Sequence, residues 1–190
     1  MSITKIAVRR PNDDPILAGR LDGKRMFLRV LEELPAFTEP TIVVLDFAGV
    51  ELATSSFLSE AVPSLREHLR LRRPPAYVVA ANLNAKVREE LDELLIRTGD
   101  VLLTCQISST GEVTGTQLAG TLEPKLLETL ELVRRRGETS AVELHSDATD
   151  SDGIGPTGWN NRLAALASKS LILEVPQGRT KKYRPILENA

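Results

Sequence analysis

Cysteine and histidine are scarce in this chain of 190 residues: Cys105 is the single cysteine, and His68 and His145 are the two histidines. A lone cysteine has no disulfide partner within the chain, which favours a reducing compartment. One cysteine and two distant histidines do not form the ligand clusters that zinc sites use. We therefore expect no metal site, no cofactor and a cytoplasmic location.

Long apolar runs are also missing, since no stretch approaches the roughly 18 residues that a membrane span needs. Residues 1–5 lack the apolar segment of a secretory signal. The sequence shows no histidine-based nucleophile in a credible context, and its best candidate acids, Asp46 and Glu60, look structural or exposed. We expect neither a membrane protein nor an enzyme.

Residues 153–158 match the Gly-x-Gly-x-x-Gly dinucleotide pattern letter for letter. That pattern needs an apolar strand before it, whereas residues 146–152 are acidic and polar. The glycines are better explained by a turn between two helices.

The net charge of −2 conceals a strong local asymmetry near the C-terminus. Residues 153–187 hold six basic side chains against Glu174 alone, whereas residues 138–152 hold five acidic ones and neither lysine nor arginine. Such a distribution would orient this part of the chain on a polyanion.

The first half of the chain alternates strand and helix patterns. Strands are predicted at 3–8, 41–45 and 76–81, and helices at 20–34, from 54–56 to 70, and around 87–95. The run at 41–45 is typical of a central strand that is buried on both faces. In the helix over 20–34, the leucines at 21, 28, 31 and 34 with Phe27 make the expected buried stripe. This half is predicted to be an α/β domain over residues 1–100.

Leu45-Asp46-Phe47-Ala48-Gly49-Val50, followed by Thr54-Ser55-Ser56-Phe57-Leu58, resembles the STAS domains of anti-sigma factor antagonists, and most closely their divergent STAS-like relatives. The resemblance covers roughly residues 15–98 and includes Ala81-Asn82-Leu83-Asn84. In the wider family an Asp-Ser-Ser-Gly box carries a serine that a partner kinase phosphorylates. Here Thr54 stands at the Asp position and Phe57 at the Gly position, and Ser56 aligns with the modified serine.

Ser55 and Ser56 therefore have two interpretations. Either serine could cap the following helix by accepting a free backbone N–H of the first turn. Alternatively, a phosphate there would be tolerated by the helix dipole and would alter a partner surface, which would make the pair a phospho-switch for a kinase-like ATPase.

Residues 101–120 hold alternating β-formers around a Ser-Ser-Thr-Gly turn, so they predict a hairpin that either extends the first sheet or links two domains. A helix is then expected from Pro124 to Arg134-Arg135-Arg136, where the arginines either complement the helix dipole or contact phosphate.

Ser140 and Glu143 have the spacing of a capping box that begins a short helix.

A third helix is predicted from Pro156, which suits the first helical position, with Trp159, Leu163, Leu166 and Ala167 as its buried stripe. Two strands at 171–175 and 183–186 follow, with a basic tip between them. The loop 147–155 is longer than that of a compact helix-turn-helix.

Residues 121–187 resemble winged-helix transcription regulators, and Trp159-Asn160-Asn161-Arg162-Leu163 resembles their recognition helix. The resemblance implies that this helix enters the major groove while the wing touches phosphates. The DNA-binding residues it nominates are Thr157, Asn160, Asn161, Arg162, Arg179, Lys181 and Lys182. Asparagine suits adenine because its amide offers both a donor and an acceptor.

The fold class expected is α/β followed by α+β: a STAS-like domain at 1–100, a hairpin or linker at 101–120, and a winged helix-turn-helix domain at 121–190. Two functions stay open. In the first, the STAS-like domain senses a protein or small-molecule signal and the winged helix binds duplex DNA, as a homodimer. In the second, the chain is an anti-sigma-antagonist-like protein-interaction switch that phosphorylation at Ser55 or Ser56 controls.

Overall fold

The computed structural model of the chain describes residues 1–108, 110–147, 154–177 and 180–187. The chain divides into two compact units, Met1–Thr121 and Leu122–Asn189, each considered by itself below. Within the described residues, no helix is both long enough and apolar enough to cross a membrane.

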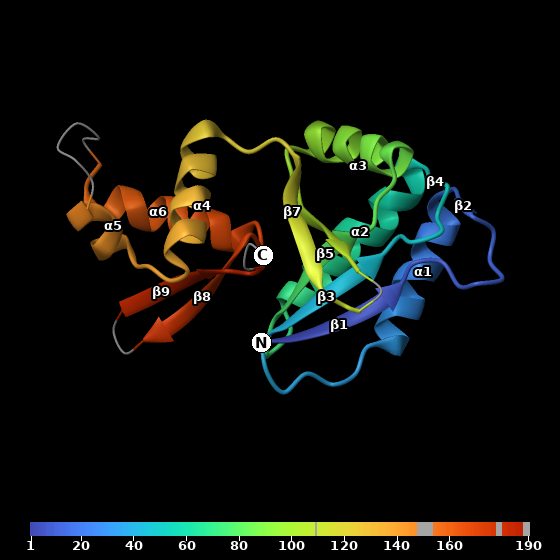
Figure 1. The fold of residues 1–190 in the computed structure, drawn as a ribbon, viewed down its shortest axis with the longest axis horizontal. Coiled ribbons are helices and arrows are strands. Elements are labelled where there is room, and N and C mark those ends of the chain that lie inside the picture. The colour runs from blue at the N-terminus through green and yellow to red at the C-terminus, as the bar shows by residue number, and fades with distance from the viewer. Residues whose placement is uncertain (109, 148–153, 178–179, 188–190) are drawn as a thin grey trace. The chain divides into compact units, whose positions relative to one another are not determined.

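The first unit is a mixed α/β fold built on a five-stranded sheet (Figure 1). Its elements are β1 (Ser2–Ala7), β2 (Ile16–Leu17), α1 (Arg20–Glu33), β3 (Thr41–Asp46), β4 (Leu52–Ala53), α2 (Ser55–Arg70), β5 (Ala76–Ala81), α3 (Ala85–Thr98), β6 (Val101–Ile107) and β7 (Val113–Gly120). The sheet order is β1-β3-β5-β6-β7, in which the first four strands are parallel and β7 is antiparallel. This mostly parallel sheet confirms the predicted α/β class of the first half.

The centre of the sheet confirms the prediction for residues 41–45. Every residue of β3 and every residue of β5 is buried. The middle of each strand is apolar, as a strand buried on both faces requires, and the polar residues of β3, Thr41 and Asp46, stand at its two ends.

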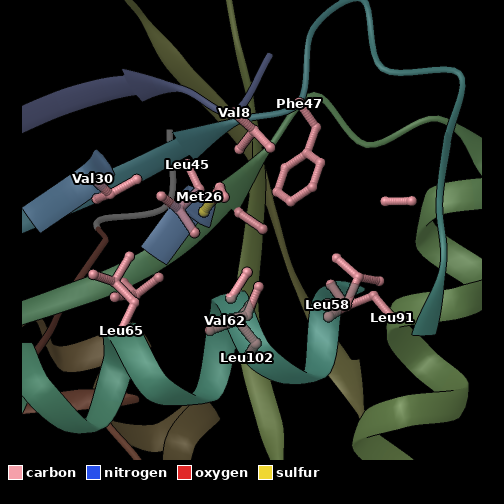
Figure 2. Packing of buried hydrophobic residues seen from close by; sticks show 14 of the residues in the cluster. Val8, Met26, Val30, Leu45, Phe47, Leu58, Val62, Leu65, Leu91 and Leu102 are labelled. Carbon is pink, nitrogen blue, oxygen red and sulfur yellow. The ribbon is translucent and has the colours of Figure 1, made fainter. Parts of the chain in front are cut away.

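The main core lies between one face of the sheet and the helices α1, α2 and α3. Alternate strand residues contribute to it, among them Val43 and Leu45 of β3 and Val78 and Ala80 of β5. Figure 2 shows Leu58, Val62 and Leu65 directed from α2 toward the strands. Side chains alternate between the two faces of a strand and return to the same face of a helix about every 3.6 residues. Each strand and each helix therefore contributes one apolar face to this core.

The expected buried stripe of α1 was wrong for Leu21 and Leu28, whereas Leu34 is buried and Phe27 and Leu31 pack partly buried against the core. The buried residues within α1 are Gly23, Met26 and Val30, whereas Leu21 and Leu28 are 62% and 56% exposed. Helix α1 carries apolar residues on more than one face, and Gly23 decides which face packs on α2. A Cβ at Gly23 would stand 2.5 Å from the carbonyl oxygen of Phe57, so only glycine permits this approach.

The hairpin predicted at 101–120 exists as β6 and β7, and it extends the first sheet. Residues 101–120 therefore belong to the sheet of the first unit. The second unit begins directly after them, at Leu122.

In the described residues of the second unit, three helices are followed by a two-stranded hairpin (Figure 1). These are α4 (Pro124–Arg136), α5 (Ala141–Asp147), α6 (Pro156–Ser168), β8 (Ile172–Gln177) and β9 (Thr180–Pro185). Thr139, just before α5, forms a reciprocal pair of backbone hydrogen bonds with Tyr183 of β9, at 3.0 and 2.7 Å. The segment between α4 and α5 is thereby held against the hairpin.

The capping box at the start of α5 is confirmed. The Ser140 backbone N–H donates to Glu143 Oε2 at 2.7 Å, and the Glu143 N–H donates to Ser140 Oγ at 3.3 Å. The glycine-rich motif offers no strand–turn–helix context in its described part, because Gly155 is the N-cap of α6 and Gly158 lies inside that helix. Gly153 lies outside the described residues.

Candidate functional site

The Thr-Ser-Ser segment lies at the N-terminus of α2, where the resemblance places the phosphorylated box. Thr54, in an extended conformation, is the N-cap, and its Oγ1 accepts the Phe57 N–H at 3.4 Å and the Gly19 N–H at 3.3 Å. The interpretation of Ser55 or Ser56 as the capping residue was therefore wrong. A threonine side chain caps as a serine does, and here its backbone has the required geometry.

Ser55 is held by two side chains of α3. Its backbone N–H donates to Glu90 Oε2 at 2.7 Å, and its hydroxyl accepts a hydrogen bond from Arg97 Nη2 at 3.0 Å. A carboxylate at a helix N-terminus is favourable because the first N–H groups and the helix dipole attract negative charge. Glu90 therefore already supplies an anion at the start of α2, and sequence spacing could not reveal it.

Ser56 is in a different position from Ser55. It is exposed, and its Oγ lies 3.1 Å from Thr54 Oγ1. Ser55 is only partly exposed, so Ser56 is the more accessible hydroxyl for a modifying partner. A phosphate on Ser55 would meet Arg97 favourably and Glu90 unfavourably.

Asp46 lies at the carboxyl end of β3, where it and Asn82 form hydrogen bonds and an ion pair with residues of β1 and β6. Its Oδ1 accepts from the Ala48 N–H at 3.0 Å and from Asn82 Nδ2 at 2.8 Å, and its Oδ2 pairs with Lys5 Nζ at 2.8 Å. Asn82 Oδ1 in turn accepts the Ile107 N–H at 2.9 Å. Burial, the largest single influence, raises the pKa of Asp46, but the hydrogen bonds from Lys5, Ala48 and Asn82 together lower the pKa below its ordinary value.

The thiol of Cys105 lies buried on β6, which is separated from β3 by β5. Burial, followed by the negative charge of Asp46, raises the pKa of Cys105 to about 11. The thiol is therefore protonated at neutral pH and is a poor nucleophile. The Cys105 backbone carbonyl accepts the Asn82 N–H at 3.1 Å, so this strand end is joined to the Asp46 network through Asn82.

Cavities on the first unit include two that border its helices. One, of about 250 Å³, lies at the start of α3, and the other, of about 340 Å³, lies between α1 and the segment after β1. Arg88 borders the first cavity but is occupied by Asp92, Thr104, Gln117 and the Leu118 carbonyl. Among the described residues, no three His, Cys, Asp or Glu side chains are grouped as a metal site would require.

Three of the residues nominated for DNA binding lie together on α6. Thr157, Asn160 and Asn161 are all exposed, whereas Trp159 and Leu163 are buried, as the helical period predicts. The exposed side of α6 continues through Ala164 and Ser168 and carries no charge. Its first two turns present two carboxamides and a hydroxyl as hydrogen-bonding groups.

Arg162 does not project with these residues. It is partly buried, and its guanidinium carbon lies 5.1 Å from the centroid of the Trp159 ring. Its Nη1 is buried and has no hydrogen-bond partner among the described residues. This cation–π contact between residues three apart places Arg162 along the flank of the helix.

The nominated lysines of the wing lie within β9, not at its tip, because the hairpin strands are longer than predicted. Lys181 pairs with Glu174 at 2.9 Å, and this hydrogen-bonded carboxylate raises the pKa of Lys181. Lys182 pairs with Glu143 of α5. Arg179, the other nominated cation, lies outside the described residues.

No curated protein matches the chain. A family comparison does match part of the first unit, within the region where the sequence resemblance was found. The matched segment contains most of α1, all of β3, β4 and α2, and hence the Thr-Ser-Ser segment. Residues 22–70 are similar to the family described as STAS-like domain of unknown function (DUF4325).

Proposed function

We propose that the chain is a DNA-binding transcriptional regulator whose second unit is a winged helix. The observation that carries this proposal is the order of α4, α5, α6 and the β8–β9 hairpin, with Thr139 bonded to Tyr183 so that a third short segment joins the hairpin. In this arrangement α6 acts as the recognition helix and the hairpin as the wing.

The exposed side of α6 supports the same function. Asn160 and Asn161 can each offer a donor and an acceptor to an adenine edge, and Thr157 lies one turn earlier. A recognition helix reads bases mainly with its N-terminal residues, which is where these three side chains lie. The side chain of Lys181 is 56% exposed beside its partner Glu174, and it supplies phosphate contacts and a salt dependence.

The STAS-like unit would receive the signal, from a protein or a small molecule. We also propose a homodimer in the cytoplasm, since winged-helix regulators usually pair on palindromic sites. Sedimentation of the free protein and of its DNA complex tests the dimer.

The test of DNA binding begins with selection of tight binders from a random duplex pool by the full chain. Fluorescence anisotropy then compares the selected duplex with a scrambled one at low and moderate salt. Asn160→Ala and Asn161→Ala should each weaken specific binding by about 1–3 kcal/mol and leave binding to the scrambled duplex unchanged.

Ser168→Ala, at the far end of the same exposed face, is the matched control and should bind as the parent chain does. The absence of binding to any duplex at low salt would refute the proposal. Equal losses on specific and scrambled DNA would instead refute base recognition by α6.

A second function is favoured by the STAS-like match, which includes Ser55 and Ser56. In it, the chain is an anti-sigma-antagonist-like interaction switch, and a kinase-like ATPase phosphorylates one of these serines. Incubation of the protein with cell extract and ATP, followed by mass spectrometry, should then place phosphate on the exposed Ser56. An unmodified Ser55–Ser56 peptide under conditions that phosphorylate other proteins would count against this function.

A further inference from the structure

Lys182 on β9 and Glu143 on α5 form an ion pair between residues 39 positions apart. The lysine side chain is only 21% exposed, whereas the carboxylate side chain is 47% exposed. Lys182 is therefore the less exposed partner of an ion pair that itself reaches solvent. A phosphate that approached this part of the wing would meet Glu143 as well as Lys182.

Glu143 is fixed at this place independently of Lys182. Its Oε2 accepts hydrogen bonds from the Ser140 N–H at 2.7 Å and from Ser140 Oγ at 3.0 Å, while its Oε1 meets the lysine. Hydrogen bonds from Lys182 first, and then from Ser140, lower the pKa of Glu143. The carboxylate is thus ionised at neutral pH and is held by the capping box.

Lys181, the neighbouring lysine of β9, cannot replace Lys182 as the partner of Glu143. Successive residues of a strand face opposite sides, so Lys181 and Lys182 point away from each other. Lys181 accordingly has a separate partner, Glu174, and its side chain is 56% exposed. Of the two described lysines of the wing, Lys182 is the one that is covered.

We propose that Glu143 masks Lys182 and thereby weakens the affinity of the second unit for duplex DNA. This inference rests on the proposed DNA-binding function. It predicts that loss of the charge at Glu143, without loss of its capping role, releases one further phosphate contact. Glu143→Gln is the suitable change, because glutamine serves at this position of a capping box as glutamate does.

The experiment measures anisotropy of the full chain with a selected duplex over a range of salt concentrations. Four proteins are compared: the parent, Glu143→Gln, Lys182→Ala and the double variant. Glu143→Gln should bind about two- to fivefold more tightly, as expected for release of an exposed ion pair. Its plot of log K against log salt should be steeper by about 0.9, because one more phosphate is neutralised.

Lys182→Ala alone should change binding little, whereas the same substitution should abolish the gain in the Glu143→Gln background. Glu128→Gln on the exposed side of α4 removes the same charge from the same unit and serves as the control. Lys182→Ala leaves the capping box intact. The comparison of Lys182→Ala with the parent is therefore informative even if Glu143→Gln folds poorly.

Equal affinity and equal slope for Glu143→Gln and the parent would overturn the inference. A gain that persists without Lys182, or that Glu128→Gln reproduces, would also overturn it, since the effect would then be one of net charge. Failure of all the proteins to bind any duplex would instead refute the proposed function itself.

Discussion

Gly23 sets the distance between α1 and α2. A Cβ at this position would lie 2.5 Å from the Phe57 carbonyl oxygen and 3.0 Å from Glu60 Cβ, and the first of these is backbone that cannot easily move. Gly23→Ala should therefore lower the free energy of unfolding by about 1–3 kcal/mol, as overpacked sites do. Helix propensity alone would predict a gain of up to about 1 kcal/mol. Urea unfolding of Gly23→Ala shows whether the free energy of unfolding falls or rises. Lys24→Ala, at the next position of the same helix, is the control.

Asp46 makes a pH-dependent contribution to stability. Because its folded-state pKa lies below its unfolded-state pKa, the ionised form favours the folded chain. The contribution is complete above the unfolded pKa of about 3.9 and disappears as the pH falls through the folded value.

Asp46→Asn should lower the free energy of unfolding at pH 7 by about 1–3 kcal/mol, since an amide cannot accept from both Asn82 and Lys5 as the carboxylate does. The difference between variant and parent should narrow below about pH 4. Denaturant titrations at several pH values measure it. Asp22→Asn, which breaks an exposed pair with Arg25, should cost less than about 1 kcal/mol at every pH.

At the scale of the element, the start of α2 depends on Thr54 and not on the serines after it. Thr54→Ala removes the acceptor for the Phe57 and Gly19 N–H groups and should destabilise the protein by about 0.5–2 kcal/mol. Ser56→Ala, at an exposed position, should change stability by less than about 0.5 kcal/mol. Equal thermal shifts for the two variants would contradict this assignment of the cap.

At the scale of the whole molecule, the two units should respond separately to loss of core packing. The main core cluster lies entirely within residues 6–119, and Leu163 is fully buried in the second unit. Leu163→Ala should cost the second unit about 2–5 kcal/mol. Hydrogen exchange should then quicken in α4, α6 and β9 while amides of β3 and β5 keep their protection. Leu91→Ala should show the opposite pattern, and a uniform loss in both variants would show that the units unfold as one.

Local patterns in the sequence were sufficient to predict most of the helices and strands. The buried strand at 41–45, the capping box of Ser140 and Glu143, and the exposed positions of Asn160 and Asn161 all follow from spacings of four residues or fewer. Such spacings determine which side chains share a helix face or reach a free backbone N–H, so they can be read without knowledge of the packing.

Packing decided everything that joins distant residues. Glu90 and Arg97 reach Ser55 across 35 and 42 residues, and Glu143 covers Lys182 across 39. The buried face of α1 was decided in the same way. The face that contains Gly23 packs against α2, because a residue without a Cβ allows α2 to approach there. The sequence by itself determined the order of the longer strands and of the helices, but not the two-residue strands β2 and β4, and it determined the residues exposed on α6. The tertiary structure alone decided which charges pair between different elements, because such pairs depend on positions in space that sequence separation does not record.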